Sequence, residues 1–152
     1  MLYLARNKLE IASLTHRVRL DRIDAKQLPY ENGRFSAVIS NSIVHHIPQP
    51  AQVLAEAWRV LAPGGLIFVR DLLRPQSEDE LQALVQTYAT EAGEHARQMF
   101  TDSLHAALSL DEVRGLVQEL GLEAESVRQT SDRHWTWSER KPAGSLLSTA
   151  DA

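Results

Sequence analysis

Two adjacent histidines follow a short apolar segment in the first third of the chain. Residues 36–40 are typical of a strand buried on both faces, and Asn41, Ser42, His45 and His46 come after it. Histidine can act as a general base near neutral pH. For His46, this role and the capping of a backbone group stay open, whereas for His45 the capping role is favoured. Because adjacent histidines rarely point the same way, we expect no two-histidine metal site.

A second group of candidate ligand contacts lies upstream. Asp24 ends a predicted strand over residues 18–23, where its carboxylate can accept a hydrogen bond from an exocyclic amine. The N–H of Ala25 can donate to a ring nitrogen, and Leu28 can lie on an aromatic face. These contacts would form an adenine clamp. From the residue types alone, an Asx turn that begins at Asp24 is the favoured alternative.

Charged side chains follow two further strands. The guanidinium of Arg70 can hold an acidic substrate, although Asp71 can equally pair with Arg70 or with Arg74, which is the simpler interpretation. Arg133 and His134 begin a strand near the C-terminus and are candidate substrate contacts.

The elements that position these side chains alternate along the chain. Helix, strand, strand, helix and strand follow each other with short connections, which predicts an α/β domain with a mostly parallel sheet. Ligands of such sheets bind beyond the carboxyl ends of the strands, where the loops 24–35 and 41–50 lie. These five elements cover residues 2–12, 18–23, 36–40, 52–61 and 66–69.

A helical block and two strands complete the domain. Ser77 with Glu80 and Ser109 with Glu112 resemble capping boxes, which predict helix starts at both serines. Strands are expected at 122–130 and 133–138. We expect a domain over residues 1–140 and, from its small and polar residues, a disordered tail over 141–152.

Composition narrows the class of partner. The 152 residues are 43% apolar and 24% charged, with a net charge of −4. The lack of a basic excess argues against nucleic acid or anionic membrane as the main partner. The chain has no cysteine, which fits a cytoplasmic setting, and no apolar run near the roughly 20 residues of a membrane helix.

Four motifs in order resemble the class I S-adenosylmethionine-dependent methyltransferases of the ubiquinone/menaquinone-biosynthesis type (methyltransferase type 11). The resemblance implies a Rossmann-like fold, S-adenosylmethionine as cofactor, and methyl transfer to a small-molecule acceptor. The motifs are Asp24-Ala25-x-x-Leu28-Pro29-Tyr30, Phe35-Ser36-Ala37-Val38-Ile39-Ser40-Asn41, His45-His46, and Glu56-x-x-Arg59-Val60-Leu61-x-Pro63-Gly64-Gly65.

The resemblance also implies roles for residues. His46 would lie near the reactive methyl group as the catalytic candidate, and helices within 77–108 would cover the substrate pocket. The implied cofactor contacts are Asp24, Ala25, Leu28, Asn41 and Ser42, and the candidate substrate contacts are His45, Arg70, Arg133 and His134.

The sequence departs from the family pattern at its start. The family's glycine-rich turn and the strands around it have no counterpart, so we expect an N-terminally truncated domain with an incomplete cofactor site, weak cofactor binding and an exposed apolar sheet edge. That edge would allow a partner or a second copy to pair. Two alternatives follow: a non-catalytic remnant or interaction subunit, and a fragment of a Rossmann-type nicotinamide oxidoreductase, which would also need a glycine loop of its own.

Overall fold

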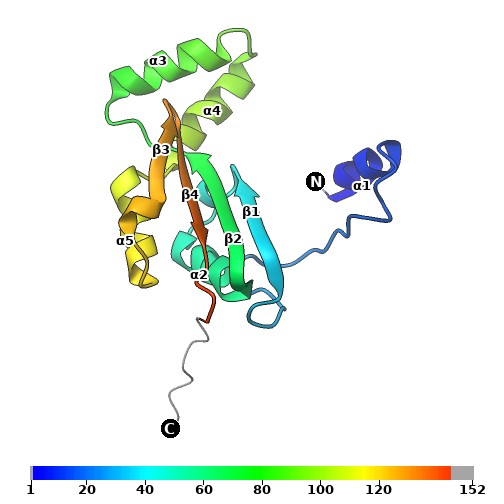
Figure 1. Cartoon of the computed structure of the whole chain (residues 1–152). Helices are drawn as coiled ribbons and strands as arrows, with labels where there is room; N and C mark the ends of the chain where they lie inside the picture. The colour runs from blue at the N-terminus through cyan, green and yellow to red at the C-terminus, as the bar shows by residue number, and fades with distance from the viewer. Residues whose placement is uncertain (1, 145–152) are drawn as a thin grey trace.

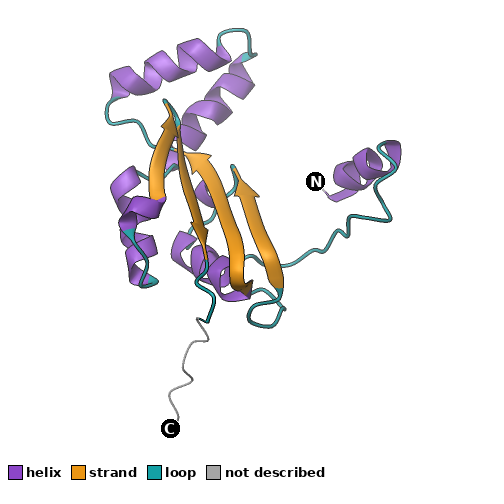
Figure 2. Cartoon of the chain, in the orientation of Figure 1, coloured by secondary structure: helices purple, strands orange, loops and turns teal. Residues whose placement is uncertain are grey.

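One four-stranded sheet organises the chain (Figures 1 and 2). The computed structural model describes residues 2–144, and its strand order is β1-β2-β4-β3. The strands are β1 (Phe35–Asn41), β2 (Leu61–Leu72), β3 (Val127–Ser131) and β4 (His134–Arg140). The helices are α1 (Leu2–Ile11), α2 (Pro50–Val60), α3 (Glu78–Ala89), α4 (Glu94–Ala106) and α5 (Leu110–Glu119), with the short 3-10 helices η1 (Val44–His46) and η2 (Ala124–Ser126).

The sheet is mixed and mostly antiparallel, so the prediction of a mostly parallel sheet was wrong. Only β1 and β2 are parallel, whereas β4 runs antiparallel to both β2 and β3. The cause is local: Asp132 and Arg133 form a two-residue turn between β3 and β4. A connection this short can only join antiparallel strands.

The segment predicted as a strand at 18–23 is not a strand in the structure. It belongs to the connection between α1 and β1, and no described strand lies beside it. Val18 and Ile23 are each 41% exposed, and α1 contains no buried residue. Figure 1 shows α1 standing apart from the sheet at the end of this connection. A strand needs a neighbour to accept its backbone hydrogen bonds, and without one the pattern alone is insufficient.

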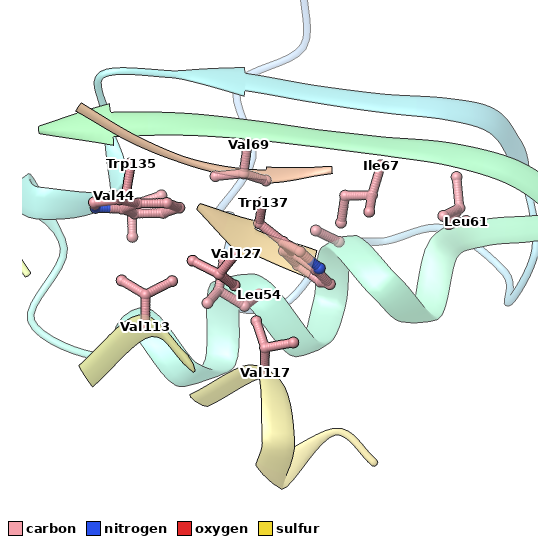
Figure 3. Packing of buried hydrophobic residues seen from close by; sticks show 11 residues of the cluster. Val44, Leu54, Leu61, Ile67, Val69, Val113, Val117, Val127, Trp135 and Trp137 are labelled. Carbon is pink, nitrogen blue, oxygen red and sulfur yellow. The ribbon is translucent and has the colours of Figure 1, made fainter. Parts of the chain in front are cut away.

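The main hydrophobic core lies on one face of the sheet, under α2 and α5. Trp135 and Trp137 of β4 both point into it, because alternate strand residues share a face. Figure 3 shows these rings between the sheet and the helices that carry Leu54 and Val117. Full burial of such side chains stabilises by roughly 1.5–3 kcal/mol each, so this face holds the domain together.

Within residues 2–144, no helix covers the other face of the sheet, and β1 is an edge strand of the described sheet. Ile39 of β1 is 72% exposed, so the prediction that this strand is buried on both faces was wrong. In Figure 1, α3 and α4 form a hairpin beyond the carboxyl end of β2. They share a small core of their own, to which Leu72 and Leu104 contribute. None of the described helices combines the length and the apolar character needed to cross a membrane.

Lys141 ties the end of β4 to the end of α2. Its buried ammonium donates hydrogen bonds to the carbonyls of Trp58 (2.8 Å) and Leu61 (2.9 Å), which satisfies acceptors that the last helical turn leaves open. Burial lowers the pKa of Lys141. The tail predicted to be disordered over 141–152 thus begins with a buried lysine, and from residue 145 onward it lies outside the described residues.

Candidate functional site

A buried carboxylate organises the loop that follows β1. Asp71 is 0% exposed, and its Oδ2 accepts hydrogen bonds from the backbone N–H groups of Ile43 (2.9 Å) and Val44 (2.6 Å). Its Oδ1 accepts from the N–H of Leu72 (2.7 Å) and contacts His45 Nδ1 at 2.5 Å. A buried charge is tolerated only when it is fully hydrogen-bonded, and here both oxygens are. The expected pairing of Asp71 with Arg70 or Arg74 was therefore wrong.

The same contacts fix the orientation of His45. Because both oxygens of Asp71 already accept backbone hydrogen bonds, Nδ1 of His45 carries the hydrogen and donates it. This assigns the tautomer in which Nε2 is free to accept. The His45 side chain is 4% exposed, and no described residue hydrogen-bonds to its Nε2.

His45 and His46 border one hollow beyond the carboxyl end of β1. Its volume is about 270 Å³, and its walls come from η1, the start of α2 and the segment after α4. The two imidazole rings lie 4.0 Å apart, but His46 is exposed and hydrogen-bonds through its backbone only. The residues around the hollow are Val44, His45, His46, Ile47, Pro48, Pro50, Ala106 and Leu108.

The turn at Ser42 directs this loop. Ser42 has a φ of 54°, in the left-handed region, and its N–H donates to the carbonyl of Arg70 (2.9 Å). The reversal brings the N–H groups of the next two residues onto Asp71. Asn41 is exposed at the end of β1, opposite Arg70. Both predicted contacts for the methionine end of the cofactor thus lie at the ligand edge of the sheet, a few residues from His45.

The predicted adenine contacts lie elsewhere. Asp24 is exposed, and its Oδ1 accepts hydrogen bonds from the N–H (2.9 Å) and the ammonium (3.0 Å) of Lys26. Hydrogen bonding from the Lys26 N–H lowers the pKa of Asp24. This is the Asx turn given above as the alternative. Ala25 is half-buried in the same turn, on the connection that leads away to α1.

The backbone of Leu28 is hydrogen-bonded to an ion pair on α2, formed by Glu56 and Arg59. Its N–H donates to Glu56 Oε2 (2.7 Å), and its carbonyl accepts from Arg59 Nη2 (3.0 Å). Arg59 Nε donates to Glu56 Oε1 (2.6 Å), and its Nη1 donates to the carbonyl of Tyr30 (2.7 Å). The hydrogen bond from Arg59 lowers the pKa of Glu56. The motif Glu56-x-x-Arg59 therefore anchors the loop before β1, and the Leu28 N–H is already used.

The remaining substrate candidates meet on the opposite side of β2. Arg70 Nη2 lies 3.2 Å from His134 Nδ1, which also lies 2.8 Å from Ser131 Oγ. Burial, followed by the charges of Arg70 and Arg133, lowers the pKa of His134. The guanidinium of Arg133 stacks over the ring of Tyr88 in α3, 3.3 Å from its centroid, and links α3 to the β3–β4 turn. The structure thus brings three of the four candidates together and leaves His45 with Asp71.

Sequence reasoning missed Asp71 as a site residue. The sequence did indicate this role, because an acidic residue at the end of a buried strand needs several hydrogen-bond donors. The chain offers them 26 to 28 residues away, in the loop that carries the histidines. Arg74 instead pairs with Glu112 of α5.

The fold and the site define an α/β protein with its ligand side at the carboxyl ends of β1 and β2. The chain belongs to the class I S-adenosylmethionine-dependent methyltransferases, a family whose cofactor is S-adenosylmethionine. The family described as "Methyltransferase domain" matches residues 1–69.

Two relatives are similar to the chain in sequence, and a solved structure shares its fold. The chain is 34% identical over 128 residues to 27-O-demethylrifamycin SV methyltransferase from Amycolatopsis mediterranei, covering 82% of this chain and 44% of that protein. It is 24% identical to the ubiquinone/menaquinone biosynthesis C-methyltransferase UbiE of a Marinomonas species, covering 83% and 54%. A SAM-dependent methyltransferase from Aquifex aeolicus superposes with a TM-score of 0.60 at 14% identity, covering 90% and 61%, which shows the shared fold. The chain spans about half the length of the curated relatives it matches.

Proposed function

We propose that this chain takes part in methyl transfer from S-adenosylmethionine to a hydroxyl oxygen of a small molecule, with His45 as general base. The observation that carries the proposal is the His45–Asp71 pair beside the hollow. S-adenosylmethionine supplies an electrophilic methyl group on a sulfonium. A hydroxyl that attacks this carbon must lose its proton, and the free Nε2 of His45 is a group that can take it.

The electrons and the proton balance in one displacement. The acceptor oxygen forms a bond to the methyl carbon while the carbon–sulfur bond breaks, and that electron pair stays on sulfur as a neutral thioether. The acceptor proton moves to Nε2 of His45. Asp71 holds the ring in the required tautomer and faces the imidazolium that forms. Since positioning supplies most of the rate in such transfers, a fixed ring matters more than a strong base.

Two features favour oxygen over other acceptors. A hydroxyl is a weak nucleophile until its proton is removed, so a preoriented histidine is useful to it. The relative from Amycolatopsis mediterranei is named for methylation at an oxygen, whereas the name of the Marinomonas relative specifies carbon. Ala106, the last residue of α4, and Leu108 line the hollow, which supports a role for the end of α4 in contacting the acceptor.

The residues present fit the cofactor in part. Asn41 and Ser42 lie at the ligand edge of the sheet, near His45, and suit the methionine end. Asp24 and Ala25 lie on the connection to α1, and Leu28 has its N–H on Glu56, so the adenine contacts are not assembled beside the hollow. We therefore expect weak binding of S-adenosylmethionine to this 152-residue chain. Micromolar binding measured by calorimetry would contradict that expectation.

The test compares two neighbouring histidines. Methyl transfer from S-[methyl-³H]adenosylmethionine at millimolar concentration is measured with a panel of phenols and secondary alcohols, for the unmodified chain, His45→Gln and His46→Gln. We expect His45→Gln to lower turnover about 10²–10⁴-fold, with His46→Gln close to the unmodified protein. Equal turnover of His45→Gln and the unmodified chain would refute the role of His45. Loss of turnover in His46→Gln alone would return the catalytic role to His46, the residue expected from the sequence.

A second candidate function is a non-catalytic interaction subunit. The observation that favours it is that the expected adenine contacts are not assembled beside the hollow. Failure of every acceptor at millimolar cofactor, in a chain that is folded and associated with a partner, would support this function over methyl transfer.

A further inference from the structure

We propose that Arg70 and His134 form a second binding site, for the carboxylate group of a small acid, at the carboxyl end of β2. Arg70 lies near the end of β2, and His134 begins β4 directly after the β3–β4 turn. The site lies on the other face of β2 from Asp71, because neighbouring strand residues point to opposite faces. The inference is therefore independent of the methyl-transfer proposal, which uses His45 and Asp71.

Hydrogen bonds define the donors that His134 presents. Its Nδ1 lies 3.2 Å from Arg70 Nη2 and 2.8 Å from Ser131 Oγ. A guanidinium has donors only, so Nδ1 accepts and carries no hydrogen. The hydrogen of the neutral ring is consequently on Nε2, which makes this nitrogen a donor. Among residues 2–144, no acceptor is found for this Nε2–H or for the Nε and Nη1 groups of Arg70.

Both carboxylates near the imidazole are engaged by other groups. Asp71 accepts its four hydrogen bonds on the opposite face of β2. Asp132 accepts from the hydroxyl of Tyr88 at 2.5 Å and from Arg133 Nη1 at 3.4 Å. The charge of Arg133 is thus balanced by Asp132, whereas the charge of Arg70 has no carboxylate partner in the described part of the chain.

The local charge favours an anion. Burial, followed by the charges of Arg70 and Arg133, lowers the pKa of His134, although Asp132 and Asp71 act in the opposite direction. The contribution of the two guanidinium groups reflects a positive potential at the ring. A carboxylate would offset this potential, and its two oxygens match the donors of a guanidinium. Because one guanidinium charge is unbalanced, a ligand with a single negative charge fits better than a phosphate dianion.

Contacts between β2, α3 and the β3–β4 turn hold the site in place. The N–H of Leu73 donates to the carbonyl of Arg133 (2.9 Å), which fixes the turn to the end of β2. The Arg133 guanidinium stacks over the ring of Tyr88, 3.3 Å from its centroid, and Figure 1 shows α3 beside this turn. These contacts all lie within residues 73–133. A preformed site loses less conformational entropy when a ligand binds, so it can hold even a small anion.

Binding of a carboxylate and protonation of His134 should favour each other. Protonation places a hydrogen on Nδ1, which can then no longer accept from Arg70, and this guanidinium becomes available to the anion. By linkage, the anion raises the pKa of His134 by the same free energy by which protonation tightens anion binding. A rise of about 1 in this pKa corresponds to about tenfold tighter binding to the protonated form.

The first experiment follows the histidine ring protons by NMR as the pH is changed. The chain has six histidines, and the signal of His134 is identified by its absence from His134→Gln. Titrations are run with and without acetate in the millimolar range, at an ionic strength held constant with sodium chloride, because salt screens charges. We expect acetate to raise the pKa of His134 by about 0.5–1, equivalent to about three- to tenfold in affinity, and to leave the other histidines unchanged.

Two arginine variants test where the carboxylate binds. Arg70→Gln removes its proposed partner. The matched control is Arg128→Gln, which removes the same charge from β3, where the guanidinium donates to the carbonyl of Glu125 (3.1 Å). We expect the response to acetate to be lost in Arg70→Gln and kept in Arg128→Gln. The spectrum of each variant also reports whether it is folded, and the titration of the unmodified chain tests the proposal without any variant.

A second ligand distinguishes two sources of the carboxylate. Hydroxyphenylacetate carries both a carboxylate and a phenol. A change in the His134 signal alone would indicate a free acid as the natural ligand, whereas changes at His134 and His45 together would indicate a molecule that also reaches the hollow. Both results support the site. Failure of the bound phenol to accept a methyl group would then contradict the methyl-transfer proposal and leave this site unaffected.

Three results would overturn the proposal. Acetate could leave the pKa of His134 unchanged in the unmodified chain. It could raise this pKa equally in Arg70→Gln, which would assign the effect to general screening of charge. Inorganic phosphate at the same concentration could raise it more than acetate does, which would make the ligand a phosphate and not a carboxylate.

Discussion

Replacing Asp71 by asparagine tests the central claim about the site, that one buried carboxylate holds the loop after β1. Asparagine has nearly the same shape, so it leaves the packing unchanged. One of its two terminal atoms is an NH₂ group, which donates and cannot accept. Whichever way the amide is turned, it will face two of the four donors that Asp71 now satisfies.

The magnitude follows from those contacts. Each buried donor left without an acceptor costs about 1–3 kcal/mol, so the two that face the NH₂ group cost about 2–6 kcal/mol together. A domain of this size has a free energy of unfolding of about 5–15 kcal/mol, of which this loss is a large part. If the amide oxygen faces Ile43 and Val44, then His45 loses its orienting partner, and methyl transfer should fall as in His45→Gln.

The assay is urea unfolding followed by tryptophan fluorescence, since Trp135 and Trp137 are buried in the main core and will report its loss. Asp24→Asn is the matched control. Its carboxylate is exposed, and the amide oxygen of asparagine can still accept from the N–H of Lys26, so its unfolding midpoint should stay that of the unmodified chain. A loss below about 1 kcal/mol for Asp71→Asn would refute the reasoning, because less than one donor would then be unsatisfied.

Two further substitutions test other parts of the fold. A Cβ at Gly65 would lie 2.9 Å from the carbonyl oxygen of Ser36, so Gly65→Ala should lower the free energy of unfolding by about 1–3 kcal/mol. Gly115 lies in α5 with open space around it, so Gly115→Ala should raise the free energy of unfolding by up to about 1 kcal/mol. Urea unfolding measures both changes. Burial and the charge of Arg70 lower the pKa of His134, so the unfolded chain takes up protons that the folded chain resists, and the free energy of unfolding falls as pH drops below about 6.5. His134→Gln should flatten this fall between about pH 6.5 and 5, and an unchanged slope would contradict the proposed environment of His134.

Local signals in the sequence were sufficient for the helices that carry their own caps. Ser109 accepts from the N–H of Glu112, and the Glu112 carboxylate accepts from the N–H of Ser109, which is the predicted capping box. Ser77 caps α3 by accepting from the N–H of Glu80. These contacts join residues three apart, so the sequence contains all of their partners within one turn.

The sheet could not be predicted in the same way, because its strands depend on neighbours far along the chain. The pattern at 18–23 matches a strand, yet a strand forms only where another lies beside it. The direction of β4 is fixed by the two-residue turn before it, of which Arg133 was predicted as a substrate contact instead. Ile39 was expected to be buried because apolar runs usually are, but burial also requires a neighbour on each side.

The histidine pair shows why the site needed the structure. Residue type and order placed His45 and His46 in the loop after β1, but they could not distinguish the two rings, which differ by one position. The difference comes from Asp71, on the adjacent parallel strand, which reaches His45 and leaves His46 exposed. In a parallel pair the carboxyl ends of both strands meet at one edge, so an acidic residue at the end of β2 is in reach of the loop after β1. An acidic residue at the end of one buried strand is therefore expected to pair with a histidine in the loop after the neighbouring parallel strand. Applied to this sequence, that rule selects His45 as the partner of Asp71.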